Sequence, residues 1–310
     1  MEFVIPCLAA LVAVLALTPL ARYVAHRRHF LDHPEDRKVH KAPVPLLGGI
    51  AVFGGVLIAL ATGISLGSIA VTEKLIGLVL GAGLLVVLGL VDDRQGMSPA
   101  VKLAGQILAG AIIVYFGFRV SFIENEFVSV LVSLFWIVGL INAMNLLDNM
   151  DGMTGGVAFI ASSAFLVVSI LSGDLLAATL AGALGGACLG YLRYNLPPAS
   201  IFLGDAGSML VGFLLAALGL MISNGQQTFT GLAIPLIVLA YPIFDTTLVT
   251  ITRLAEGRSV AIGGKDHSTH RIFTLTNSAR KTVLWVYGIN SLLTVAAIYL
   301  HNSGDGIVAG

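Results

Sequence analysis

Long apolar runs separated by short polar connections make up almost the whole chain. Each run has about 20 residues, the length that a helix needs to cross the hydrocarbon core of a membrane. The pattern predicts ten transmembrane helices, near residues 3–21, 44–64, 75–91, 100–117, 127–147, 154–172, 175–192, 202–222, 231–252 and 282–300. The predicted fold is all-α: a polytopic integral membrane helical bundle, with residues 1–310 as a single domain.

Composition supports this class and excludes a soluble globular protein. Hydrophobic residues make up 57% of the chain and charged residues only 11%, whereas soluble domains carry about 25% charged residues. The 36 glycines suit close approach of helices in lipid. The N-terminal sequence Met1-Glu2-Phe3-Val4 lacks the basic segment of a signal peptide, so we expect the first run to remain as a span.

Basic residues predict the orientation of the bundle. Fifteen of the seventeen lysines and arginines fall in or beside the connections on one side. They are Arg22, Arg27, Arg28, Arg37, Lys38, Lys41, Arg94, Lys102, Arg193, Arg253, Arg258, Lys265, Arg271, Arg280 and Lys281. Because cytoplasmic connections carry an excess of Lys and Arg, this side is predicted to be cytoplasmic and both termini to lie outside the plasma membrane. The zero net charge indicates no nucleic acid partner.

Acidic residues gather at the same predicted membrane boundary. Asp92 and Asp93 close the third run. Two adjacent carboxylates repel one another unless a cation or a shared proton neutralises them, which indicates a metal or proton-transfer role. A solvated helix end is the alternative, and for an isolated Asp-Asp pair it is the better one.

A second polar cluster recurs with a spacing of three residues. Asn142, Asn145, Asp148 and Asp151 would share one face if the fifth helix continued through them. Such a face is costly in lipid and should line a polar cavity. A cap built from Asn and Asp would explain one or two of these residues but not four.

Asp205 follows Gly204 just inside the eighth run, and Asn195 precedes a Pro-Pro break. Asp is a good helix N-cap, so the local sequence leaves a cap and a metal ligand equally open. The other acidic clusters on this side favour the ligand. Asp245 lies about two turns inside the ninth run, where a carboxylate must be paired or face a cavity; a supporting and a direct role both remain open.

The connection 253–281 is the longest on the predicted cytoplasmic side, and connections of this length are usually functional or disordered. It offers cationic donors suited to a diphosphate: Arg258, Lys265, His267, His270 and Arg271. The alternatives are a zinc site, which lacks a Glu directly after the first His and a nearby Cys, and an ordinary basic loop. Lys41 could also bind phosphate, although a basic loop beside the membrane explains it equally well.

Taken together, these motifs resemble the polyprenyl-phosphate N-acetylhexosamine-1-phosphate transferases. They are K-x-x-x-P-x-x-GG at 41–49, DD at 92–93, N-x-x-N-x-x-D-x-x-DG at 142–152, N-x-x-P-x-x-x-F-x-GD at 195–205 and the His-rich last loop. The resemblance implies transfer of a sugar 1-phosphate from a UDP-N-acetylamino sugar to a polyprenyl phosphate, with release of UMP, at the start of cell-envelope glycan synthesis.

The resemblance also implies residue roles. The catalytic residues would be Asp92, Asp93, His267 and His270; the Mg²⁺ ligands Asp205 and Asp148; and the substrate-binding residues Lys41, Asn145, Asp148, Asp151, Asn195, Arg258, Lys265 and Arg271. Mn²⁺ is the expected substitute metal, and membrane lipid and a second copy of the chain are the further candidate partners.

Departures from the family pattern leave the sugar open. The translocase of peptidoglycan synthesis has a His-His-His run followed by Tyr-Glu, which is absent here and argues against a MurNAc-pentapeptide donor. The sugar-transferase pattern His-x-His-His appears as His267-Ser268-Thr269-His270, and the translocase lysine after the DD pair is Gly96 here. The rival hypotheses are an ion-coupled transporter, which predicts polar groups at mid-membrane, and a membrane scaffold, which has no use for stacked Asn and Asp residues.

Overall fold

Helices account for nearly all of the regular structure. The computed structural model describes residues 2–34, 42–226, 229–259, 264 and 266–308. Its helices are α1 (Val4–Arg27), α2 (Gly48–Ser65), α3 (Glu73–Gln95), α4 (Pro99–Tyr115), α5 (Glu126–Leu147), α6 (Met153–Leu171), α7 (Leu175–Asn195), α8 (Gly204–Gln226), α9 (Phe229–Val238), α10 (Ala240–Ala255), α11 (Ser268–Thr276) and α12 (Ala279–Val308). Two short strands, β1 (Leu31–Asp32) and β2 (Val44–Pro45), pair antiparallel. The all-α prediction is confirmed.

A helix occupies each of the ten predicted runs. Among the described residues, eight helices are long and apolar enough to cross a membrane. The fourth run is the shorter apolar helix α4, and the ninth is the pair α9 and α10, bent by 69°. The ninth run is therefore two helices joined at a bend and not one continuous helix. Pro242 has no N–H for the Val238 carbonyl, and its ring would clash with that carbonyl, so α9 ends at Val238.

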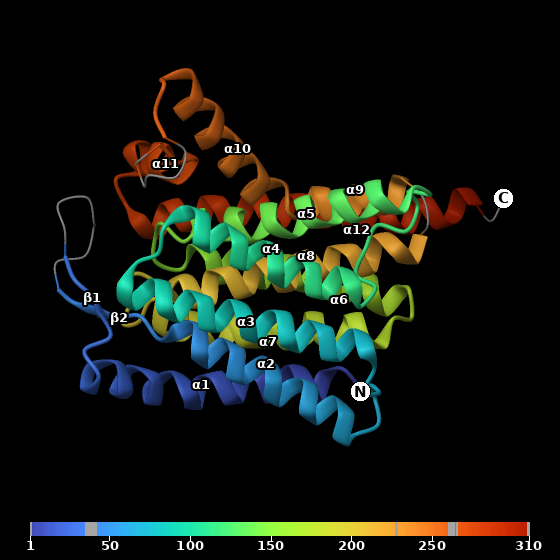
Figure 1. The fold of residues 1–310 in the computed structure, drawn as a ribbon, viewed down its shortest axis with the longest axis horizontal. Coiled ribbons are helices and arrows are strands. Elements are labelled where there is room, and N and C mark those ends of the chain that lie inside the picture. Colours follow the sequence, from blue (N-terminus) through green and yellow to red (C-terminus); the bar gives the residue numbers. More distant parts are fainter. Residues whose placement is uncertain (1, 35–41, 227–228, 260–263, 265, 309–310) are drawn as a thin grey trace.

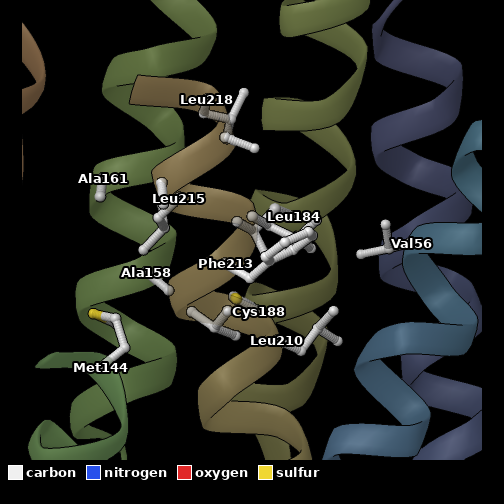
Figure 2. Close-up of a cluster of buried hydrophobic side chains, with 14 of the residues drawn as sticks. Val56, Met144, Ala158, Ala161, Leu184, Cys188, Leu210, Phe213, Leu215 and Leu218 are labelled. Carbon is white, nitrogen blue, oxygen red and sulfur yellow. The ribbon is translucent and has the colours of Figure 1, made fainter. Parts of the chain in front are cut away.

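The helix α8 is the centre of the bundle: 94% of the residues in its most apolar stretch are buried. It packs against α2, α3, α5, α6, α7 and α9. Figure 2 shows side chains of α8 in contact with those of neighbouring helices, and the residues labelled there are Val56, Met144, Ala158, Ala161, Leu184, Cys188, Leu210, Phe213, Leu215 and Leu218. The side chains on the first turn of α8 are therefore held in position by several helices at once.

The crossing of α3 and α8 requires glycine. A Cβ added at Gly89 would lie 2.2 Å from the Ala206 backbone nitrogen and 2.3 Å from its Cα, both far inside contact distance. This crossing lies one turn before Asp92 on α3 and next to Asp205 on α8. The close approach of the two backbones therefore brings the two acidic motifs together.

The two ends of the bundle differ in character. In Figure 1, α1 begins and α12 ends at one end of the molecule, while the β1–β2 hairpin and α11 lie at the other. The connection 253–281 was expected to be functional or disordered; it contains α11, which packs on α12. The chain therefore gathers its larger polar connections at a single end.

Candidate active site

Asp205 lies in the first turn of α8 and collects polar groups from two other helices. Asn145 of α5 donates from Nδ2 to Asp205 Oδ1 at 2.7 Å. Lys102 of α4 donates from Nζ to Asp205 Oδ2 at 2.6 Å. The Asp205 carboxylate thus binds side chains from α4 and α5, which a residue serving only as a helix cap would not do.

Lys102 joins the two acidic motifs. Its Nζ lies 2.9 Å from Asp92 Oδ2 and donates to Asn145 Oδ1 at 3.2 Å, in addition to its bond to Asp205. One ammonium group therefore holds two carboxylates and an amide oxygen. A cation in the first turn of a helix is electrostatically disfavoured by the helix dipole, so the carboxylates are what stabilise Lys102 there.

Sequence reasoning missed this role of Lys102 and counted it only among the basic residues of the cytoplasmic side. One signal was present. Lys102 is a lone charge near the start of the fourth apolar run, shortly after the connection that carries Asp92 and Asp93. A charge so placed needs a partner.

Asp93 faces α8 rather than Lys102. Its Oδ1 accepts the backbone N–H of Asp205 at 2.8 Å and its Oδ2 that of Ala206 at 3.3 Å, two of the N–H groups that a helix start leaves without intrahelical partners. Gly204 has a φ of +71°, and a Cβ there would lie 2.6 Å from Asp93 Oδ2. Neither member of the pair is a solvated helix end: Asp92 holds Lys102, and Asp93 holds the start of α8.

The spacing of Asn142, Asn145, Asp148 and Asp151 does not produce one continuous face. The helix α5 ends at Leu147, and Asp148 is its C-cap. Asn142 pairs with Gln106 of α4, donating from Nδ2 to Gln106 Oε1 at 2.7 Å. The expectation of a helix that continues through all four is wrong, because Gly152 and the loop before it reverse the chain into α6; of the four, Asn145 is the one bonded to Asp205.

The loop after α5 is tied to the segment that precedes α8. Asp151 Oδ2 accepts the backbone N–H of Ala199 at 2.8 Å. Asn195 Oδ1 accepts the backbone N–H of Gly152 at 2.9 Å, and its Nδ2 donates to the Ile201 carbonyl at 2.9 Å. The structure thus gives Asn195 and Asp151 a bracing position between two connections of the same end of the bundle.

Asp148 is the C-cap of α5 and precedes Asp151 in the same loop. Burial raises the pKa of the Asp148 carboxyl to about 7, and the charges of Asp205 and Asp151 add to the rise. A cation close to Asp148 would favour the charged form of this carboxyl. Asp148 is therefore close enough to Asp205 to be electrostatically linked to it.

The histidine loop reaches the same region. Thr269, in the first turn of α11, donates from Oγ1 to Asn149 Oδ1 at 2.8 Å, next to Asp148. The His267 and His270 rings have centroids 5.8 Å apart. The two predicted histidines therefore lie side by side at the start of α11, anchored to the loop that carries Asp148.

Of the four basic residues predicted to bind substrate, the structure describes two, Arg258 and Arg271. Arg258 binds Asp266, donating from Nη2 to Oδ1 at 3.0 Å, and together with Arg253 it lowers the pKa of Asp266 to about 2. Arg271 is exposed on α11. Lys41 and Lys265 lie outside the described residues.

Comparison with known proteins shows the family to which the chain belongs. Residues 75–223 match the family model of glycosyl transferase family 4. A probable undecaprenyl-phosphate N-acetylglucosaminyl 1-phosphate transferase of Bacillus subtilis is 32% identical over 97% of this chain and 86% of its own length. The chain belongs to glycosyl transferase family 4. It is similar also to a decaprenyl-phosphate N-acetylglucosaminephosphotransferase of Mycolicibacterium smegmatis, 30% identical over 100% of this chain and 85% of the relative.

The family match agrees with the site geometry. The matched region contains Asp92, Asp93, Lys102, Asn145 and Asp205, the groups that meet around the start of α8. The undecaprenyl-phosphate alpha-N-acetylglucosaminyl 1-phosphate transferase of Escherichia coli is 28% identical over 92% of this chain and 78% of its own length. The chain is thus a multi-pass membrane transferase of family 4, and the resemblance inferred from its motifs is confirmed.

The donor set suits the Mg²⁺ that the family resemblance implies. Within the described parts of the chain, no three His, Cys, Asp or Glu side chains are grouped as a self-sufficient metal site. However, Asp92 Oδ2, Asp205 Oδ2 and Asn145 Oδ1 converge on one cationic atom, Lys102 Nζ. Mg²⁺ is usually held by one or two carboxylates, with waters and substrate phosphates completing its shell, so these hard oxygens fit it.

Proposed function

We propose that this protein transfers N-acetylglucosamine 1-phosphate from a UDP-sugar to a polyprenyl phosphate and releases UMP. The observation that carries the proposal is the Asp92–Lys102–Asp205 cluster at the start of α8. The relatives from Bacillus subtilis and Mycolicibacterium smegmatis are named for N-acetylglucosamine 1-phosphate transfer involving undecaprenyl or decaprenyl phosphate. Those names favour N-acetylglucosamine as the sugar that the histidine motif left open.

The reaction exchanges one phosphoanhydride bond for another. A phosphate oxygen of the lipid attacks the β-phosphorus of the UDP-sugar, the bond from that phosphorus to the bridging oxygen breaks, and UMP leaves with that oxygen. A phosphate monoester has its second pKa near 6, so its attacking oxygen is largely unprotonated at neutral pH. Catalysis then depends on positioning and charge neutralisation more than on proton transfer.

Lys102 supplies part of that neutralisation. Its ammonium is an N–H donor with a fixed positive charge at the meeting point of α3, α4, α5 and α8, and it is suited to a phosphate oxygen. Asp92, Asp205 and Asn145 are the residues that would hold Mg²⁺, with Mn²⁺ as substitute; when bound, the metal supplies positive charge to the diphosphate. Asp93 keeps the start of α8, and with it Asp205, in place.

The loop that carries Asp148 and Asp151 and the histidine loop enclose the donor in this proposal. The bonds of Asn195 and Asp151 hold the first loop against the segment before α8, which gives the nucleotide a fixed wall. His267 and His270 provide donors for the diphosphate, with Arg271 exposed beside them. A second copy of the chain is not required by any of these contacts.

The proposed orientation places the site on the cytoplasmic side of the plasma membrane, with both termini outside. It is supported by the fifteen of seventeen basic residues on that side and by the position of the hairpin and α11 at one end of the bundle (Figure 1). A UDP-sugar is water-soluble and cytoplasmic, whereas the acceptor is embedded in lipid, so both substrates reach this end.

The test is a product assay on the purified protein in lipid nanodiscs. Protein, Mg²⁺, undecaprenyl phosphate and UDP-N-acetylglucosamine should yield UMP and a lipid-linked diphosphate sugar, and omission of either substrate should abolish UMP release. UDP as the product would mean that the sugar alone is transferred and would refute the proposed bond cleavage. Uptake of solute into proteoliposomes without UMP formation would support the transporter instead.

A further inference from the structure

A buried carboxylate on α10 holds the histidine loop. Asp245 is fully buried, and its Oδ2 lies 2.7 Å from His267 Nδ1. Its Oδ1 accepts two further hydrogen bonds from Ser268, one from the backbone N–H at 2.7 Å and one from Oγ at 2.6 Å. All three contacts are made with the first residues of α11 and its N-cap, which lie 22 and 23 positions further along the chain.

These contacts determine which nitrogen of His267 carries a proton. An ionised carboxylate only accepts hydrogen bonds, so Nδ1 must be the donor toward Asp245. The other ring nitrogen, Nε2, then points away from Asp245. Within the described part of the chain, no hydrogen bond to Nε2 occurs, although His267 is only 3% exposed.

A buried Asp within an apolar helix is costly unless its charge is satisfied. Here the cost is offset by a His ring and two donors of one neighbouring residue, and Tyr241 extends the network through its hydroxyl, 2.9 Å from Ser268 Oγ. Because α10 is bent away from α9 at Leu239, Asp245 faces α11. A purely stabilising role would be met by apolar residues of similar size, which often serve as well as a buried pair.

We propose that Asp245 is a positioning residue: it fixes His267 with Nδ1–H donated to its carboxylate and Nε2 directed to the diphosphate of the donor substrate. The proposal rests on the proposed function for the ligand of Nε2. The orientation of the ring by Asp245 is independent of it. When Nε2 carries a proton as well, Nε2–H donates a charge-assisted bond to a phosphate oxygen while Nδ1–H stays on the Asp245 carboxylate.

Asp245→Asn is the informative variant because it preserves shape. The Asn oxygen can keep both bonds from Ser268, so the start of α11 stays anchored. The Asn Nδ2 group only donates, so His267 Nδ1 must become an acceptor and the ring must be neutral with its proton on Nε2. The variant therefore changes the protonation pattern of one ring and little else.

The direct readout is the ¹⁵N spectrum of the protein labelled at histidine, in nanodiscs, with the His267 signals assigned by their loss in His267→Asn. We expect a protonated Nδ1 in the wild type and an unprotonated Nδ1 in Asp245→Asn. In the product assay, kcat/KM for the UDP-sugar should fall roughly tenfold in Asp245→Asn, since a charge-assisted hydrogen bond becomes a neutral one.

Tyr241→Phe is the matched control, because it removes a hydroxyl from the same buried network without touching Asp245 or His267. It should keep the wild-type ¹⁵N pattern and the wild-type kcat/KM. A loss in Tyr241→Phe equal to that in Asp245→Asn would mean that the network only holds the loop, and would overturn the positioning role.

The outcomes separate this inference from the proposed function. A wild-type His267 with an unprotonated Nδ1 overturns the inference even if the protein releases UMP, and this reading stands if Asp245→Asn fails to fold. The expected ¹⁵N change in a protein that releases no UMP with any UDP-sugar supports the orientation of His267 and refutes the transferase assignment alone. Unchanged kcat/KM with the expected ¹⁵N change removes His267 from the diphosphate site.

Discussion

Lys102→Met tests the central cluster most directly. The change keeps most of the side-chain volume but removes the cation that Asp92 Oδ2 and Asp205 Oδ2 share at 2.9 and 2.6 Å. Two unit charges about 5 Å apart repel by about 3 kcal/mol at an effective dielectric constant of about 20, and because both oxygens lie within hydrogen-bond distance of the same nitrogen, the repulsion here is of at least that order. The side chains of Lys102, Asp92 and Asp205 are 18%, 11% and 31% exposed, so solvent and salt reduce this figure.

We expect three results from this variant. Without divalent cation, its thermal midpoint should fall by several degrees, because the repulsion is no longer offset. Mg²⁺ should raise that midpoint more in Lys102→Met than in the wild type, since no ammonium competes for the same oxygens. UMP release should nevertheless fall by about 10²-fold or more, the usual cost of losing a group that stabilises developing charge.

The assays are thermal unfolding in nanodiscs with and without Mg²⁺ and the UMP assay at saturating Mg²⁺. Lys281→Met is the control, because Lys281 is an exposed lysine on α12 and lies outside the cluster. An unchanged midpoint and an unchanged Mg²⁺ response in Lys102→Met would show that Asp92 and Asp205 do not depend on this cation. The reasoning from the geometry would then be refuted.

Three further results are expected. Asp205→Asn should reduce UMP release by about 10²-fold with little change in the thermal midpoint; normal turnover at limiting Mg²⁺ would show that Asp205 does not bind the metal. Gly89→Ala should destabilise the fold by about 1–3 kcal/mol through overpacking against Ala206, measured by thermal unfolding; the control Gly139→Ala meets nothing within 4 Å, and equal behaviour of the two variants would contradict the tight crossing. Removal of divalent metal by EDTA should abolish UMP release and Mg²⁺ or Mn²⁺ should restore it, whereas a zinc-specific chelator should have no effect while Mg²⁺ remains; loss of activity with that chelator would point to the zinc alternative.

The spans could be predicted from the sequence because a segment in lipid must satisfy its backbone hydrogen bonds internally, as a helix does. A run of about 20 apolar residues is therefore enough to predict a membrane-spanning helix. The sequence also carried one signal for the break in the ninth run, because Pro242 removes a helical hydrogen bond, although Pro19 lies within the continuous helix α1. The sequence did not show in which direction α10 leaves α9. The 69° bend depends on how α10 packs, and only this packing brings Asp245 to His267.

The motifs predicted which residue types form the site but not which atoms meet. Asp92 and Asp93 are adjacent in sequence, yet they separate because consecutive helical residues point about 100° apart on a helix of 3.6 residues per turn. One therefore reaches α4 and the other α8. Asn142 and Asn145 separate in a similar way, the first to Gln106 and the second to Asp205.

The sequence alone determined the fold class, the number of apolar runs, the side that carries the charges and the family motifs, because these follow from local composition and spacing. The tertiary structure alone decided that Lys102 is shared by Asp92 and Asp205 and that Asp245 holds His267. Those pairs are separated by 10, 103 and 22 positions along the chain, and they form where the close crossing of α3 and α8 and the bend before α10 bring the helices together. Contacts of this kind depend on how whole helices pack, and helix packing cannot be predicted from local sequence patterns.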